Sequence, residues 1–99
     1  MARILHGDFE WDEAKARLNL KHHGVSFEEA TSVFDDPLGV PYIDEEHSRE
    51  ESRYVILGES NQRRLLIVAY AQRERIRIVS ARKMAASELR TYEESEKNF

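Results

Sequence analysis

With 99 residues, of which 40% are apolar, the chain has room for one domain, residues 1–99, and enough apolar material for its core. The longest apolar run, residues 65–71, is far shorter than the roughly 18 to 20 residues of a membrane-spanning helix. The N-terminus has no apolar signal segment, so we expect a cytoplasmic protein without membrane contact. The absence of cysteine excludes disulfides, thiolate metal sites and cysteine nucleophiles.

The formal net charge of −4 argues against a uniformly basic nucleic-acid binder, but the charge is unevenly distributed. Residues 1–50 carry −7 and residues 51–99 carry +3, and eight bases between Arg53 and Lys83 oppose only Glu59 and Glu74. Such a basic stretch can direct a positive field from one face of an acidic protein. The alternative is a solvated sheet edge whose positive side chains discourage edge pairing.

Two helices are predicted near the N-terminus. After a short extended segment at Phe9–Trp11, Asp12 is placed to cap a helix over residues 13–23, with Ala14 and Leu18 in a thin apolar stripe and Gly24 as its C-terminal stop. Residues 26–29, Ser-Phe-Glu-Glu, have the form of a capping box, in which the Ser26 hydroxyl and the Glu29 carboxylate both accept from free amides. This second helix ends before Pro37.

Beyond Pro37 the pattern becomes extended. Four strands are predicted, over residues 38–43, 53–57, 64–71 and 75–81, joined in part by hairpins at 58–63 and 71–74. The run 65–69 is apolar on both faces, which indicates a central strand. Alternation in the last strand sends Arg75, Arg77 and Val79 to one face and Ile76, Ile78 and Ser80 to the other. A helix over residues 84–94 completes an α+β fold: two N-terminal helices, an antiparallel sheet of about four strands and a C-terminal helix.

In this order the residues resemble the BrnT family. The motifs that carry the resemblance are Phe9-Glu10-Trp11-Asp12, Asn19-Leu20, the run from His23 to Ala30, Val33-Phe34, Asp36-Pro37, His47-Ser48 with Glu51 and Arg53, Gly58 and Ser60, the run from Ile78 to Arg82, and Tyr92-Glu93. The resemblance implies a RelE-like toxin domain and a metal-independent endoribonuclease that inhibits translation. Two positions depart from the family pattern, since His22 replaces the usual lysine and Arg63 replaces a usual glycine.

Partners also follow from the resemblance. It implies an RNA substrate and a BrnA-like ribbon-helix-helix antitoxin that neutralises the toxin, with operator DNA contacted only through the toxin–antitoxin complex. We expect a dimer or a toxin–antitoxin hetero-oligomer, and no cofactor. The competing hypothesis is a non-catalytic, antitoxin-binding subunit that acts as a transcriptional co-repressor. A third is a toxin inactivated by the change at position 22.

Metal-independent RNA cleavage needs a base for the ribose 2′ proton, an acid for the leaving 5′ oxygen and cations for the charge that develops on phosphorus. Histidine serves as base or acid, and the planar arginine fork binds two phosphate oxygens. The predicted catalytic residues are His23, Glu51, Arg64, Arg77 and Arg82. The predicted RNA-binding residues are Arg53, Arg63, Arg73, Arg75 and Lys83.

Each candidate also has a structural interpretation. His23 lies beside a helix C-terminus, where the helix dipole favours a cation, and His47 lies in a polar loop. Glu51 can simply pair with Arg53, and Arg82 can anchor the last helix to an acidic partner. No metal site is predicted, because the adjacent His22 and His23 cannot both face one ion comfortably from a helix.

Overall fold

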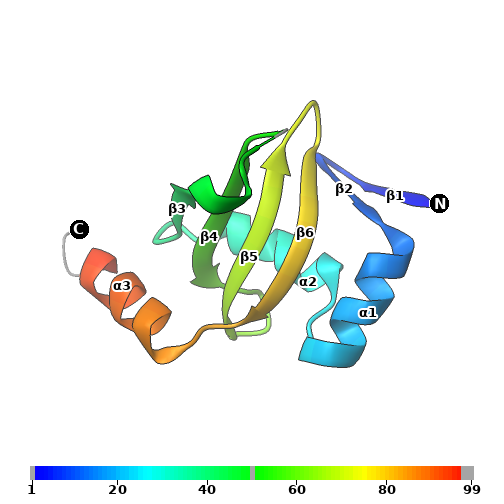
Figure 1. Cartoon of the computed structure of the whole chain (residues 1–99). Helices are drawn as coiled ribbons and strands as arrows, with labels where there is room; N and C mark the ends of the chain where they lie inside the picture. Colours follow the sequence, from blue (N-terminus) through cyan, green and yellow to red (C-terminus); the bar gives the residue numbers. More distant parts are fainter. Residues whose placement is uncertain (1, 50, 97–99) are drawn as a thin grey trace.

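The structure, a computed structural model, describes residues 2–49 and 51–96. It contains one mixed sheet with the strand order β1-β2-β6-β5-β4-β3 (Figure 1). The strands are β1 (Arg3–His6), β2 (Phe9–Asp12), β3 (Val40–Ile43), β4 (Arg53–Glu59), β5 (Leu65–Gln72) and β6 (Ile76–Lys83). The helices are α1 (Glu13–His23), α2 (Phe27–Ser32) and α3 (Ala86–Glu96), with the 3-10 helices η1 (Val33–Asp35) and η2 (Glu45–His47). The predicted α+β class is confirmed.

The N-terminal part of the fold prediction is wrong, because the chain begins with a hairpin rather than with a helix. Strands β1 and β2 pair antiparallel around Gly7, whose φ of 58° is left-handed. Strand β2 then pairs in parallel with β6, which makes the sheet six-stranded and mixed instead of four-stranded and antiparallel. Parallel pairing joins segments far apart in the chain, so the local pattern of residues 3–12 does not reveal it.

The predicted apolar stripe of α1 is also wrong, since Ala14 is exposed and the side chain of Leu18 is 54% exposed. The buried residue of α1 is polar. The Asn19 amide donates to the carbonyls of Val25 and Ala81 at 2.9 and 2.8 Å and accepts from the Ala81 amide at 3.1 Å. Asn19 thus fastens α1 to the backbone of β6.

We therefore expect Asn19→Ala to lower the free energy of unfolding by about 1–3 kcal/mol, because it leaves buried amide and carbonyl groups without partners. Leu18→Ala, on the same helix, should change it by less than about 0.5 kcal/mol. Urea denaturation of both variants measures the difference. A larger loss for Leu18→Ala than for Asn19→Ala would contradict this packing.

Both predicted helix boundaries at the α1–α2 junction are confirmed. Gly24 is left-handed with φ 69° and its amide donates to the Leu20 carbonyl, and the Ser26 hydroxyl accepts from the Glu29 amide at 3.0 Å. The second half of the predicted capping box is wrong, because the Glu29 carboxylate faces the sheet instead, where it accepts from Ser60 and Arg64. A charged partner just before β5, Arg64, outcompetes the amide at the start of the glutamate's own helix.

Helices α1, α2 and η1 cover one face of the sheet, as Figure 1 shows. The core between them consists of buried side chains from the helical layer and from β2, β4, β5 and β6: Trp11, Val25, Phe27, Ala30, Val33, Ile56, Leu66, Val68, Tyr70, Ile78 and Ala81. A bulge opposite Ala69 and Tyr70 shifts the register of β6, so that Ala81 and not the predicted Ser80 shares the buried face with Ile78. The central position predicted for β5 is confirmed.

Two backbone positions shape the end of β4 and its connection to β5. Arg63 has a left-handed φ of 60°, the conformation that glycine adopts at least cost, which explains why a glycine suits this turn. Gly58 lies against η1, where an added Cβ would come within 2.8 Å of Val33 Cγ1. This end of the sheet is therefore tightly packed.

Helix α3 leaves the end of β6 and lies apart from the other helices (Figure 1). Tyr92 is buried and donates to Asp36 Oδ2 at 2.7 Å, which connects α3 to the end of η1. In the described part of the chain, no helix has both the length and the apolar character needed to cross a membrane.

Candidate active site

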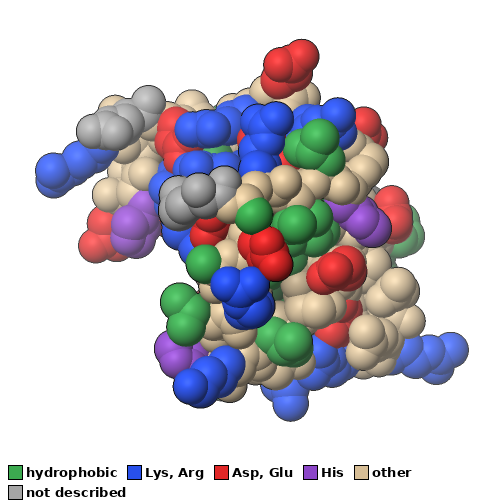
Figure 2. All heavy atoms as spheres, turned by 90° about the vertical axis from the view of Figure 1, so that its right-hand side faces the viewer, with side chains coloured by type: hydrophobic (Ala, Val, Ile, Leu, Met, Phe, Trp, Pro, Cys, Tyr) green, Lys and Arg blue, Asp and Glu red, His purple; other side chains and the backbone are tan. Residues whose placement is uncertain are grey.

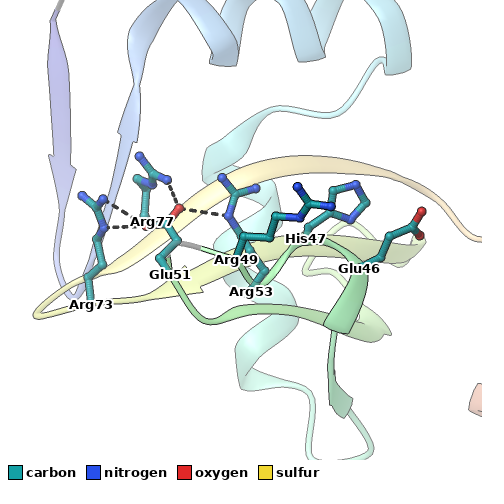
Figure 3. A pocket seen from close by; sticks show the side chains of 7 residues that line it. All are labelled: Glu46, His47, Arg49, Glu51, Arg53, Arg73 and Arg77. Atoms are coloured by element: carbon teal, nitrogen blue, oxygen red, sulfur yellow. Dashed lines mark hydrogen bonds and ion pairs between the residues drawn. The ribbon is translucent and has the colours of Figure 1, made fainter.

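Three arginines converge on one carboxylate at the end of the sheet where β5 turns into β6. Glu51, just before β4, accepts from Arg53 Nε at 2.9 Å and from Arg73 Nε at 3.0 Å, and it also pairs with Arg77 Nη2. Figure 3 shows the three guanidinium groups around the Glu51 carboxylate. We call Glu51, Arg53, Arg73 and Arg77 the arginine cluster.

The sheet register explains why these side chains meet. Arg53 of β4 and Arg77 of β6 both pair with Ala71 of β5, so the two arginines project from the same face on either side of a buried alanine. The small Ala71 side chain leaves the space above it to the guanidinium groups. Arg73 reaches the same place from the β5–β6 connection, and this face of the sheet is opposite the one that α1 and α2 cover.

An open hollow of about 840 Å³ lies over the arginine cluster. Besides the cluster it is lined by Glu46, His47 and Arg49, which come from η2 and the loop that follows it. Basic side chains gather along the upper edge of the molecule in Figure 2, at the level of the β5–β6 connection. An anion approaching this edge therefore meets several guanidinium groups at once.

The arginines of the cluster stabilise the ionised form of the Glu51 carboxylate. Partial burial of the Glu51 carboxylate opposes its ionisation, but hydrogen bonds from Arg53 and Arg73 and the charges of Arg77 and Arg73 outweigh burial and hold the pKa of Glu51 below its usual value. Within residues 2–49 and 51–96, the buried side-chain polar atom without a hydrogen-bond partner is Arg77 Nε. A buried donor without a partner is energetically costly, so this donor is an unsatisfied polar group within the arginine cluster.

His47 lies at the rim of the hollow. Its Nδ1 is 2.8 Å from Asp44 Oδ2, and 62% of the side chain is exposed. The carboxylate fixes one ring nitrogen and leaves the other available for proton transfer. The sequence predicts a solvated loop residue at His47, and its exposure agrees, but its position in the lining of the hollow also makes it a candidate for proton transfer.

Arg64 lies away from the cluster. Arg64 and Ala71 are seven residues apart, a separation of roughly 23 Å along an extended strand. Arg64 Nε donates to Glu29 Oε2 at 2.9 Å, and its Nη2 donates to the Gly24 carbonyl at 3.0 Å. The hydrogen bond from Arg64 outweighs burial and lowers the pKa of Glu29. These contacts connect the α1–α2 junction to β5.

The other predicted residues are distributed over both ends of the sheet. Arg82 makes two hydrogen bonds to Glu88, of 2.8 and 2.7 Å, and so anchors the start of α3, as its structural interpretation proposed. His23 and Lys83 are exposed, and Arg63 lies in the β4–β5 turn. Arg75 donates to the Gly7 carbonyl at the end where the arginine cluster lies. Of the five predicted catalytic residues, the structure brings together Glu51 and Arg77.

Two residues near the cluster were not singled out in the sequence. Arg49 lines the hollow, and no local pattern distinguishes it from other loop arginines. Glu10 is 5% exposed and pairs in register with Arg77. The sequence does indicate the direction of its side chain. Glu10 alternates with Phe9 and Trp11 in an extended segment, so its side chain must face away from theirs.

No group of three or more histidine, cysteine or acidic side chains suited to a metal ion occurs in the described ranges 2–49 and 51–96. The cationic groups that line the hollow are arginines: Arg49, Arg53, Arg73 and Arg77. Their planar forks match phosphate oxygens.

A family model described as the ribonuclease toxin BrnT of type II toxin–antitoxin systems matches residues 11–88. The chain belongs to the BrnT family. The matched range includes the whole arginine cluster and most of the sheet, and it ends near the start of α3.

One solved structure with a similar fold is the 1.1 Å crystal structure of the ribonuclease toxin BrnT from Brucella abortus. The TM-score is 0.58 at 20% sequence identity, and the similarity covers 76% of this chain and 92% of that chain. At this identity the comparison concerns the fold. No curated protein sequence matches the chain. The recognition of a BrnT toxin from sequence motifs is thus confirmed.

Proposed function

We propose that this BrnT-family toxin is an endoribonuclease that cuts RNA with its own side chains, without a metal ion, at the arginine cluster. The observation that carries the proposal is the convergence of Arg53, Arg73 and Arg77 on one carboxylate beneath an open hollow. Together they supply the positive charge that a developing phosphorane needs, at a place where an incoming phosphate exchanges with the Glu51 carboxylate.

In the proposed reaction, the RNA phosphate takes over guanidinium contacts, and Glu51 accepts the proton of the ribose 2′-OH. The 2′ oxygen forms a bond to phosphorus while the bond from phosphorus to the 5′ oxygen breaks. His47 in its protonated form donates a proton to the leaving 5′ oxygen. The products are a 2′,3′-cyclic phosphate and a 5′-hydroxyl, and no water is consumed in this step.

The proposal extends to the partners. We expect a ribbon-helix-helix antitoxin to neutralise the protein, because a site that attracts phosphate also accepts the acidic side chains of an inhibitor. The dimer or hetero-oligomer, and contact with operator DNA through the antitoxin complex, stay predictions. The non-catalytic co-repressor is the second candidate, and it requires no cleavage.

The experiment is incubation of the purified protein with a synthetic RNA in EDTA, with and without ribosomes. We expect cleavage products that end in a 2′,3′-cyclic phosphate. Glu51→Gln should lower the cleavage rate about 10²- to 10⁴-fold, the usual contribution of a general base. RNA binding should be retained, since the substitution removes a competing negative charge.

The matched control is Glu45→Gln, an exposed glutamate of η2 outside the hollow, which should cleave at the wild-type rate. Loss of all cleavage in EDTA, with recovery on addition of Mg²⁺, would exclude the metal-independent reaction. Absence of cleavage by the wild type under every condition would favour the co-repressor.

A further inference from the structure

Glu10 is a buried carboxylate that the proposed reaction does not use. It is 5% exposed on β2, and its Oε1 lies 3.3 Å from Arg3 Nη1, which belongs to a side chain that is 68% exposed. Within the described residues, Arg3 is the ion-pair partner of Glu10. An ionised carboxylate is able to accept about four hydrogen bonds. Most of its acceptor capacity therefore remains available.

Glu10 lines a second hollow, of about 180 Å³, which we call the side hollow. It is lined by Ala2, Arg3, Glu10, Trp11 and Asp12, and by Arg73 and Arg77 of the arginine cluster. Because Arg73 and Arg77 line both hollows, the two spaces adjoin. A nucleotide whose phosphate contacts Arg77 has its own or its neighbour's base within reach of the side hollow.

The chemistry of the side hollow fits a base better than a phosphate. A buried carboxylate repels a phosphate, whereas it accepts hydrogen bonds from a neutral base that carries N–H groups. Guanine presents two such groups side by side, N1–H and N2–H, which match the two oxygens of one carboxylate. Adenine has an acceptor at N1, and uracil has one N–H on this edge.

The arginines of the side hollow supply complementary groups. Arginine donates to the O6 and N7 atoms of guanine in the commonest base-specific contact, and its planar guanidinium also stacks on unpaired bases. Arg3 lies at the rim, where its exposed side chain is able to turn toward a bound base.

We propose that the side hollow is a guanine subsite in which Glu10 reads the N1–H and N2–H groups of a base next to the phosphate bound by the arginine cluster. The assignment rests on the proposed function only for the position of that phosphate. It makes Glu10 a specificity-determining residue, and it predicts that the toxin prefers RNA with guanine at one position beside the cut.

The test measures binding and so does not depend on cleavage. Short single-stranded 2′-O-methyl oligonucleotides, identical except for guanine, inosine or adenine at one position in a uridine background, are titrated with the protein by fluorescence anisotropy. We expect guanine to bind about tenfold or more tightly than adenine. Inosine, which lacks the N2 amino group, should fall between them.

Glu10→Gln should abolish the preference for guanine, because an amide has one acceptor and cannot receive both N–H groups. The matched control is Glu13→Gln, a partly exposed glutamate on α1 that lines neither hollow, and it should keep the preference. Equal binding of the three oligonucleotides by the wild type, or a preference for guanine that survives Glu10→Gln, would overturn the subsite.

Glu51→Gln separates the two proposals, because Glu51 does not line the side hollow. It should lower the cleavage rate while the preference for guanine in binding is retained. Cleavage at the wild-type rate in Glu51→Gln would count against the proposed catalytic cluster, and a guanine preference lost only in Glu10→Gln would still support the side hollow.

Discussion

Arg77→Ala is expected to lower kcat/KM for RNA cleavage about a hundred- to a thousandfold, the usual effect of removing one group that stabilises transition-state charge. Arg77 pairs with Glu51, stands in register between Ala71 and Glu10, and lines both hollows. Its Nη2 contacts Glu51 beneath the open hollow, where a bound phosphate competes with the carboxylate for the guanidinium group. Cleavage of a synthetic RNA under single-turnover conditions measures the effect.

Two further variants serve as controls for Arg77→Ala. Arg77→Lys keeps the charge but loses the planar fork, and we expect an intermediate rate. Arg17→Ala removes an exposed arginine of α1 that pairs with Glu13, and it should leave the rate unchanged. Equal rates for Arg77→Ala and Arg17→Ala, with matching thermal melts, would show that the arginine cluster is not the catalytic site.

Arg64→Ala is expected to lower the free energy of unfolding, and not only the rate of RNA cleavage. Its partner Glu29 has a side chain that is 1% exposed, and removal of one member of a buried ion pair leaves the other charge uncompensated, at a cost of about 3–5 kcal/mol. That is a large fraction of the roughly 5–15 kcal/mol by which a domain is stable. Chemical denaturation compares Arg64→Ala with the exposed Arg90→Ala, which should have little effect.

The pH dependence of this difference has a definite sign. The pKa of Glu29 is lowered in the folded protein, chiefly by the hydrogen bond from Arg64. The stabilisation is therefore complete above the pKa of glutamate in the unfolded chain, and it is lost as the pH falls through the lower folded pKa. The gap between wild type and Arg64→Ala should shrink in acid. A gap that is constant from neutral to acidic pH would argue against the ion pair as its source.

A double variant tests whether Arg64 and Glu29 stabilise the fold through their contact with each other. Glu29→Ala combined with Arg64→Ala should be less destabilised than the sum of the single variants, because the two groups contact each other. If the effects simply add, the two residues stabilise the fold independently.

Local patterns sufficed for much of the fold. The stop at Gly24, the cap at Ser26 and the four strands beyond Pro37 depend on short-range geometry, which residue type and spacing report directly. The parallel pairing of β2 and the buried amide of Asn19 depend on β6, which lies more than 60 positions later for both. Nothing near residue 19 distinguishes a buried asparagine from an exposed one.

The candidate site was predictable in its residue types but not in its grouping. Glu51 and Arg53 were recognised as a local pair, and this contact exists, but Arg73 and Arg77 join it only through the pairing of β4, β5 and β6. Arg64 and Arg82 share their residue type with Arg77, which is why all three were predicted to be catalytic. They lie at the opposite end of the sheet, and strand direction, not residue type, separates them.

The parallel pairing of β2 with β6 also has a consequence during synthesis. Domains are made from the N-terminus onward, and the hairpin that supplies Glu10 emerges long before Arg77, which it adjoins. The residues of the arginine cluster all lie at position 51 or later. A nascent chain interrupted before β6 therefore has the N-terminal layer but no assembled arginine cluster, so unfinished copies should lack the proposed cleavage activity.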